Sequence, residues 1–246
     1  MLKYGPYMKI ARSIWSFVRT SIAILIKTKS FRKVINLQFS DENQVVLGLG
    51  MFDYIVTKNG EKYYVSKFID CVRQVQEDYR FDDINKDDIV IDIGANIGGF
   101  SIPASKKARH VYAIEPMTTE MLRENIRLNN VENITVLDLA LGNGAANKIE
   151  WGGRSKIIKT KTLADIKKIC GGCDFIKIDC EGGEWEIRAE ELENIRRIEM
   201  EVHKIGFPLS LMEERLKQAG FDYKIQYQPD ANIGLWTIHA RRNYGQ

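Results

Sequence analysis

The chain has 246 residues, of which 44% are hydrophobic and 28% are charged, a composition that excludes a disordered or low-complexity protein. The formal net charge of +3 is too small to indicate a nucleic-acid partner. We therefore expect one large α/β domain with a small extension, and no nucleic acid among its partners.

The first 40 residues carry eight basic side chains and no acidic one. Apolar residues recur there at helical spacing: Ile10, Ile14, Val18, Ile22 and Leu25. The apolar stretch is too short to span a bilayer, and no signal-peptide cleavage site follows it. We assign residues 1–40 to a basic amphipathic helical extension. It can lie on the inner face of a membrane, or pack on its own domain or on a second copy in a homodimer.

A small N-terminal region with a hairpin and a helix is expected over residues 41–80. Residues 44–49 and 51–57 look extended, and Asn59-Gly60 is a strong hairpin signal. Residues 68–79 have the apolar spacing of a helix.

From residue 81 onward, apolar runs alternate with helical patterns. Strands are expected at 89–92, 111–115, 134–139, 174–179 and 197–202, and helices at 97–108, 118–129 and 163–169. Residues 148–160 are less regular and indicate an inserted hairpin. The capping box Ser210-Leu-Met-Glu213 opens a helix to residue 219, and an antiparallel strand pair follows at 221–227 and 235–241. This order predicts an α/β, Rossmann-like domain over 81–246, with a mostly parallel seven-stranded sheet covered by helices on both faces.

The most informative stretch is D-I-G-A-N-I-G, from Asp92 to Gly98, between the first strand of this domain and its helix. Gly94 and Gly98 permit a tight turn and a close approach to a ligand. Glu115 ends the next strand, where a carboxylate can accept both hydrogen bonds of a ribose diol. Asp92 would repel a pyrophosphate but attract an ammonium and a sulfonium. The pattern favours S-adenosylmethionine over a nicotinamide cofactor, so a nicotinamide-dependent oxidoreductase is the alternative.

The predicted cofactor-binding residues lie at the ends of the first three strands: Asp92, Gly94, Ala95, Asn96, Gly98, Glu115, Pro116, Asp138 and Ala140. The fourth and fifth strands would face the methyl acceptor. Asp179 and Glu181 follow the fourth strand, and their carboxylates can accept a proton or hydrogen bonds from an acceptor. His203 follows the fifth strand and is of the residue type that most often acts as a general base. We predict Asp179, Glu181 and His203 as catalytic residues.

No metal site is predicted, although Asp179 and Glu181 could hold Mg²⁺ through oxygen ligands. Cys170 and Cys173 have the spacing of a redox pair or of half a zinc site, but no second pair completes a zinc site. We expect reduced thiols there, with a local disulfide as the alternative. Four cysteines in 246 residues suit a cytoplasmic protein.

Three blocks of the sequence resemble the FkbM family of S-adenosylmethionine-dependent methyltransferases: V-I-D-I-G-A-N-I-G-G-F at 90–100, A-I-E-P at 113–116, and F-I-K-I-D-C-E-G-G-E at 175–184. Weaker matches are A-L-G at 140–142 and E-V-H at 201–203, and the resemblance covers about residues 79–241. It implies an O-methyltransferase whose acceptor is a hydroxyl of a sugar, a glycolipid or a small natural-product-like molecule. A non-catalytic, S-adenosylmethionine-binding or membrane-associated protein is a further alternative.

Overall fold

A computed structural model of the chain describes residues 53–64, 66, 68–151, 153–204, 206–228 and 235–242, the strand at 43–47, and the helical residues 18, 21, 22, 25 and 26. The rest of the predicted extension over residues 1–40 lies outside the described residues. Its amphipathic helix and its boundary therefore stay predictions. Among the helices that the structure describes, none is both long and apolar enough to cross a membrane. The cytoplasmic location stays a prediction as well.

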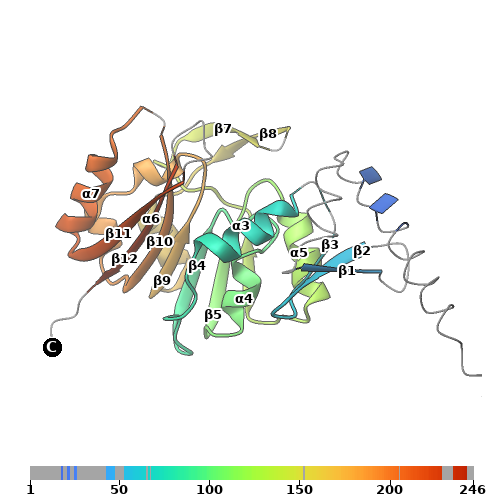
Figure 1. Cartoon of the computed structure of the whole chain (residues 1–246). Helices are drawn as coiled ribbons and strands as arrows, with labels where there is room; N and C mark the ends of the chain where they lie inside the picture. The colour runs from blue at the N-terminus through green and yellow to red at the C-terminus, as the bar shows by residue number, and fades with distance from the viewer. Residues whose placement is uncertain are drawn as a thin grey trace, which may run out of the picture.

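The central sheet has seven strands in the order β11-β12-β10-β9-β4-β5-β6 (Figure 1). Their bounds are β4 Ile89–Ile93, β5 His110–Ile114, β6 Ile134–Leu137, β9 Phe175–Ile178, β10 Arg197–His203, β11 Phe221–Gln228 and β12 Leu235–Arg242. Neighbours from β10 to β6 pair in parallel, whereas β12 runs antiparallel to both β10 and β11. This strand order confirms the predicted Rossmann-like methyltransferase fold with its C-terminal antiparallel pair.

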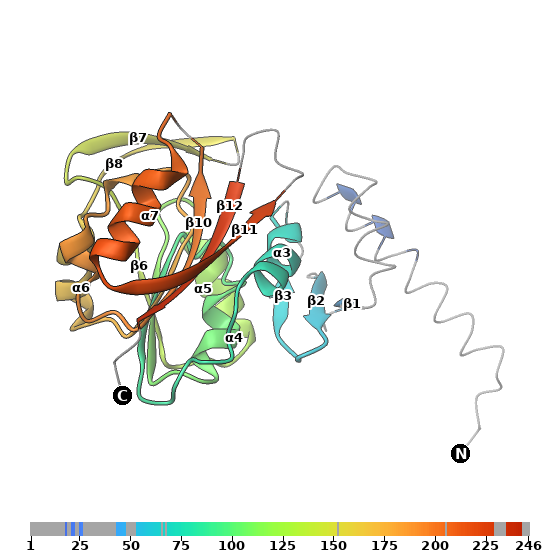
Figure 2. The same ribbon diagram turned by 60° about the vertical axis from the view of Figure 1, so that its left-hand side comes forward.

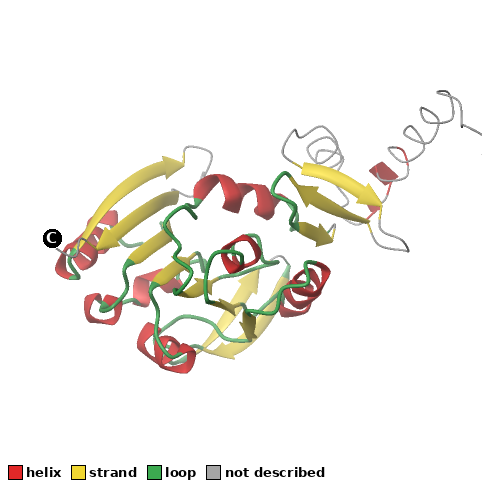
Figure 3. Ribbon diagram, turned by 90° about the horizontal axis from the view of Figure 1, so that it is seen from below, coloured by secondary structure: helices red, strands yellow, loops and turns green. Residues whose placement is uncertain are grey.

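Helices cover both faces of this sheet (Figure 3). One face packs against α3 Asp70–Asp78, α4 Ser101–Ser105 and α5 Thr119–Leu128, and the other against α6 Leu163–Cys170 and α7 Leu209–Gln218. Successive strand residues point to opposite faces. In β4, Val90 therefore packs with Ala104 of α4, while Ile91 belongs to the core that contains Ile166 of α6.

Two helices differ from the sequence-based expectation. The helix predicted over 97–108 is reduced to α4, which begins only at Ser101 because the positive φ values of Asn96 and Gly98, 49° and 97°, do not fit a right-handed helix. The prediction of a capping box at Ser210 was also wrong. The N-cap of α7 is Pro208, with no side-chain cap, so Ser210 already lies in the first turn.

The region predicted at 41–80 contains three antiparallel strands, β1 Asn43–Leu47, β2 Asp53–Thr57 and β3 Lys62–Tyr64, followed by α3. The predicted turn at Asn59-Gly60 joins β2 to β3. Ile55 and Tyr63 pack in one core with Leu122 of α5. The backbone N–H of Tyr64 donates to Asn125 Oδ1 of α5 at 3.0 Å. The domain boundary at residue 80 stays a prediction.

The predicted insertion forms the antiparallel hairpin of β7 Ala146–Trp151 and β8 Arg154–Lys159. Figure 2 shows this hairpin beyond the end of the sheet toward which β10 runs. The five parallel strands share this direction, so the hairpin lies over their carboxyl ends.

Candidate cofactor and acceptor site

A cavity of about 500 Å³ opens at the carboxyl ends of the parallel strands, where open α/β sheets bind their ligands. Its walls come from the turn after β4, the end of β5, the segment after β6, the hairpin strand β7, and the ends of β9 and β10. The lining residues include Gly94, Ala95, Asn96, Glu115, Pro116, Ala140, Trp151, Lys177, Asp179, Glu181, Glu201 and His203.

The observed geometry of the turn after β4 requires glycine at position 94. Gly94 has a φ of +75°, and a Cβ built there would lie 1.7 Å from the carbonyl oxygen of Asp179. The backbone N–H groups of Gly94 and Ala95 both donate to the carbonyl of Ile114, at 3.0 and 3.1 Å. Asn96 follows, and its buried Oδ1 receives no hydrogen bond from a described residue. That oxygen is available to a ligand in the cavity.

Glu115 ties the ends of β4 and β5 together. Its Oε2 accepts a hydrogen bond from the backbone N–H of Asn96 at 2.8 Å, and its Oε1 accepts from Met117 and Thr118 at 2.5 and 2.9 Å. A carboxylate has about four acceptor positions, so Oε2 can still accept from a ribose hydroxyl. The structure thus places Glu115 where the sequence predicted it, with an additional role in holding the turn.

Asp92 does not line the cavity. It is fully buried, accepts a hydrogen bond from Ser101 Oγ at 2.5 Å, and lies 3.3 Å from Lys177 Nζ. Burial raises the pKa of Asp92, although Lys177 and Ser101 oppose this rise. The direct contact expected between Asp92 and a cationic cofactor is therefore absent from this arrangement. Its charge is used instead to hold Lys177, which does face the cavity.

Asp138 also differs from its predicted role. Its side chain is about half exposed and forms an ion pair with Lys156 Nζ of the hairpin at 2.9 Å. Pro116, Ala95 and Ala140 line the cavity as predicted. Gly98 does not line it. A Cβ on Gly98 would approach Ile102 and Leu122 at 3.0 Å, so this glycine serves the packing of the turn on its helices.

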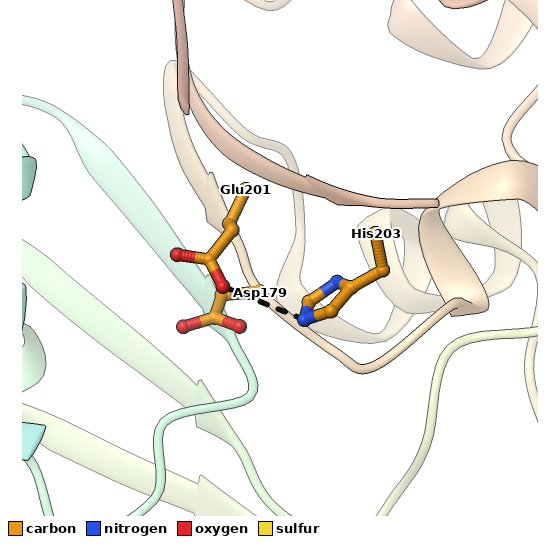
Figure 4. Close-up of side chains that lie close together, drawn as sticks. All are labelled: Asp179, Glu201 and His203. Carbon is orange, nitrogen blue, oxygen red and sulfur yellow. Dashed lines mark ion pairs between the residues drawn. The ribbon is translucent and has the colours of Figure 1, made fainter. Parts of the chain in front are cut away.

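The acceptor side of the cavity contains the cluster Asp179, Glu201 and His203 (Figure 4). Nε2 of His203 lies 3.4 Å from Glu201 and 3.4 Å from Glu181. The other ring nitrogen, Nδ1, lies 3.0 Å from Oε1 of the fully buried Glu184. The structure therefore brings the three predicted catalytic residues together and adds Glu201, whose role the sequence reasoning missed.

The carboxylates around His203 change its protonation. Burial by itself would lower the pKa of His203, but the hydrogen bond with Glu184 and the charges of Glu184 and Glu181 raise it to about 9. Burial and the charge of Asp179 raise the pKa of Glu201 to about 8, against the influence of His203. At neutral pH the imidazole is mostly protonated. In this arrangement His203 is not ready to accept a proton, contrary to the role expected from its residue type.

Lys177 is the second residue that sequence reasoning did not place in the site. It is 1% exposed, donates to the carbonyl of Gly94 at 2.9 Å, and lies 3.5 Å from Asp179. A lysine within an otherwise apolar buried strand was a visible signal in the sequence, because a buried cation requires partners.

The hairpin closes one side of the cavity through Trp151. Its ring stacks on Phe68 at a centroid distance of 4.4 Å, and its Nε1 donates to Glu181 at 3.1 Å. The structure contains no disulfide among the four cysteines, which are all described. All four are free, and Cys170 and Cys173 are reduced, buried thiols as expected.

Residues 54–142 match the family model of the TRM5/TYW2 methyltransferase domain. A probable cobalt-precorrin-6B C(15)-methyltransferase (decarboxylating) from Methanocaldococcus jannaschii is 32% identical over 92 residues, which are 35% of this chain and 50% of that protein. An uncharacterized RNA methyltransferase from Streptococcus agalactiae is 28% identical over 118 residues, which are 47% of this chain and 24% of that protein. The chain thus spans half or less of the length of these curated relatives.

Two solved structures are similar in shape. A precorrin-6y C5,15-methyltransferase from Geobacter metallireducens has a TM-score of 0.48 at 15% identity, covering 71% of this chain and 88% of that one. TYW2 from M. jannaschii, solved in complex with AdoMet, has a TM-score of 0.45 at 17% identity, covering 84% of this chain and 90% of that one.

These comparisons correct two predictions. The resemblance to the FkbM family was wrong, because the matching family model is that of the TRM5/TYW2 domain. The blocks behind that resemblance lie at or beside the ends of strands, and such positions say little about the acceptor. The exclusion of nucleic acid was also wrong, because RNA methyltransferases are among the matches. For the matched domain, the predicted class is confirmed: a methyltransferase that uses S-adenosylmethionine.

Proposed function

We propose that this chain transfers a methyl group from S-adenosylmethionine to RNA. The observation that carries the choice of acceptor is the hairpin β7–β8, which lines the cavity and is strongly basic. Residues 146–161 contain five basic side chains and one acidic side chain, a net charge of +4. Arg154, Lys156 and Lys159 are exposed on β8. Phosphate contacts from such side chains supply much of the affinity of proteins for nucleic acids.

The cofactor end of the cavity suits an adenosine. Glu115 would accept hydrogen bonds from the ribose hydroxyls, and the unpartnered Oδ1 of Asn96 would accept from a donor of the cofactor. The cofactor supplies an activated methyl group. The protein's task is to align the acceptor with that methyl group and to exclude water.

The acceptor end carries the opposite charge. Asp179, Glu181 and Glu201 face this part of the cavity, and the charges of Asp179 and Glu181 would repel a phosphate. They would instead accept hydrogen bonds from the N–H or O–H groups of a base or a ribose. The acceptor atom attacks the methyl carbon, the carbon–sulfur bond breaks, and the acceptor's proton passes to a carboxylate of this group. The phosphates of the same strand would stay outside, on the hairpin.

The hydroxyl of a sugar, glycolipid or natural product was implied by the resemblance to FkbM proteins and has no other support. An RNA acceptor accounts for the two opposite charges of the site, one at the rim and one inside. The RNA methyltransferases among the relatives support the same choice.

The test uses S-adenosylmethionine with a tritiated methyl group and the purified full-length chain. We expect label in total RNA that ribonuclease releases, and none in a protein fraction or a small-molecule extract. Label confined to protein or to small molecules would refute the RNA acceptor.

A charge-reversal pair tests the role of the hairpin. Lys159→Glu should weaken RNA binding and reduce the slope of log affinity against log salt by roughly 0.7–0.9 for each phosphate that the protein no longer neutralises. Lys168→Glu is the control, because Lys168 is also exposed but lies on α6. Equal RNA affinities of the two variants would exclude the hairpin as the phosphate-binding surface.

A further inference from the structure

We infer that Asp179, Glu201 and His203 bind a divalent metal ion at the acceptor end of the cavity. The three side chains come from the ends of two neighbouring strands, β9 and β10. Figure 4 shows their carboxylates and imidazole turned toward one another.

The spacing of the cluster fits one ion. One ligand atom from each residue lies within 4.8 Å of the others. Metal–oxygen and metal–nitrogen bonds are roughly 2.0–2.6 Å long, so two ligands on opposite sides of one ion lie about 4–5 Å apart. Three ligand atoms with such separations can surround one ion.

Glu201 gives an independent reason to expect a cation. The residue is 6% exposed and lines the cavity, yet its carboxylate receives no hydrogen bond from the part of the chain that the structure describes. Its contact is with Nε2 of His203, at 3.4 Å. A buried carboxylate without hydrogen bonds is costly unless a cation compensates it. In the metal-free protein the protonated imidazole of His203 supplies this compensation at 3.4 Å, whereas the Nζ of Lys177 is shared between Asp92 at 3.3 Å and Asp179 at 3.5 Å. A bound metal ion would take the place of that proton.

His203 has the orientation of a metal ligand. Its Nδ1 is hydrogen-bonded to Glu184, which also accepts from the backbone N–H groups of His203 and Gly182, each at 2.8 Å. Glu184 is thus fixed from three sides and fixes the ring in turn. A histidine that binds a metal ion almost always donates its other ring N–H to a carboxylate, a backbone carbonyl or water, which fixes the orientation of the ring. Here the other nitrogen, Nε2, points to Glu201 and Glu181.

The ligand set indicates the class of metal. Two carboxylates and one imidazole suit transition-metal ions such as Mn²⁺ better than Mg²⁺ or Ca²⁺, which prefer oxygen alone. Binding would displace the proton from Nε2 of His203. The role of the ion rests on the proposed function: it would hold and polarise an acceptor atom beside the methyl group. The binding itself can be measured without any acceptor.

The test is a Mn²⁺ titration of the full-length, metal-free protein, with free Mn²⁺ measured by electron paramagnetic resonance. We expect one Mn²⁺ per chain. Asp179→Asn, Glu201→Gln and His203→Ala should each weaken binding at least tenfold. Glu184→Gln should weaken it by about 10–100-fold, as expected for a residue that orients a ligand. Glu186→Gln removes an exposed carboxylate of the same cavity and should leave the affinity unchanged.

Absence of Mn²⁺ binding by the unmodified chain would overturn the inference, and so would equal affinities of all the variants. Circular dichroism of each variant establishes that it is folded. Calorimetry with S-adenosylhomocysteine on the same samples separates the two proposals. Mn²⁺ binding without S-adenosylhomocysteine binding would support the metal site while refuting the methyltransferase function. The reverse result would refute the metal site alone.

Discussion

Substitution of Gly94 by alanine should destabilise the protein at the point where β4, β5 and β9 meet. The new Cβ would lie 1.7 Å from the carbonyl oxygen of Asp179 and 2.8 Å from its carbonyl carbon. Ordinary contact begins at 3.4 Å, so the turn and the end of β9 would have to separate by about 1.7 Å. The obstacle is backbone, which cannot rotate away as a side chain can.

The expected loss has two parts. An L-residue in the left-handed region costs about 1–2 kcal/mol, and overpacking a rigid interior costs about 1–3 kcal/mol more. Gly171→Ala separates the two, because Gly171 has the same φ of +75° but no atom within 4 Å of the added Cβ. We expect a loss of roughly 2–5 kcal/mol for Gly94→Ala and of about 1–2 kcal/mol for Gly171→Ala.

Urea unfolding of both variants measures these losses, and calorimetry with S-adenosylhomocysteine measures cofactor affinity. Only the variant at Gly94 should bind the cofactor product more weakly, because that turn forms part of the cavity wall. Equal losses of unfolding free energy in the two variants would refute the reasoning, since the steric part would then be zero.

Three further outcomes follow from the site. Glu115→Gln places an amide N–H donor against backbone N–H donors, which should lower the free energy of unfolding by about 1–3 kcal/mol. The affinity for S-adenosylhomocysteine, measured by calorimetry, should fall about tenfold, whereas Glu132→Gln at an exposed position should leave it unchanged. Lys177→Met leaves Asp92 buried without its cation and should lower the free energy of unfolding in urea by about 3–5 kcal/mol. A decrease of less than about 1 kcal/mol would contradict the ion pair between Lys177 and Asp92. Burial raises the pKa of Cys170 to about 12, so Ellman's reagent at pH 8 should modify this thiol only after unfolding, and rapid labelling of the folded protein would argue against its burial.

The local sequence was sufficient for the turn after β4 and for the position of Glu115 beside it. The alternation of side chains between the two faces of β4, and the glycine turn that follows, depend only on residues close in sequence. Both the face on which a strand residue lies and a positive φ are local properties of the chain. The same reasoning placed Glu115 correctly, since the end of the next parallel strand must lie beside that turn. The hairpin turn at Asn59-Gly60 was predictable for the same reason.

The charged contacts required the tertiary structure. Asp92 and Asp138 are both acids at strand ends, yet one is buried on Lys177 and the other is paired with Lys156 of the hairpin. Sequence spacing cannot distinguish these cases, because each partner comes from a segment placed by the order of strands in the sheet.

The acceptor half of the site depended on the tertiary structure most of all. The sequence determined that a strand-end histidine and carboxylates would gather at one edge of the sheet. Only the folded sheet decided that Glu184 holds one nitrogen of His203 while Glu201 lies near the other. Such pairings depend on register between β9 and β10 and on the path of the short turn between Gly183 and Glu186. They are set by contacts between distant segments, and no local pattern of residues encodes them.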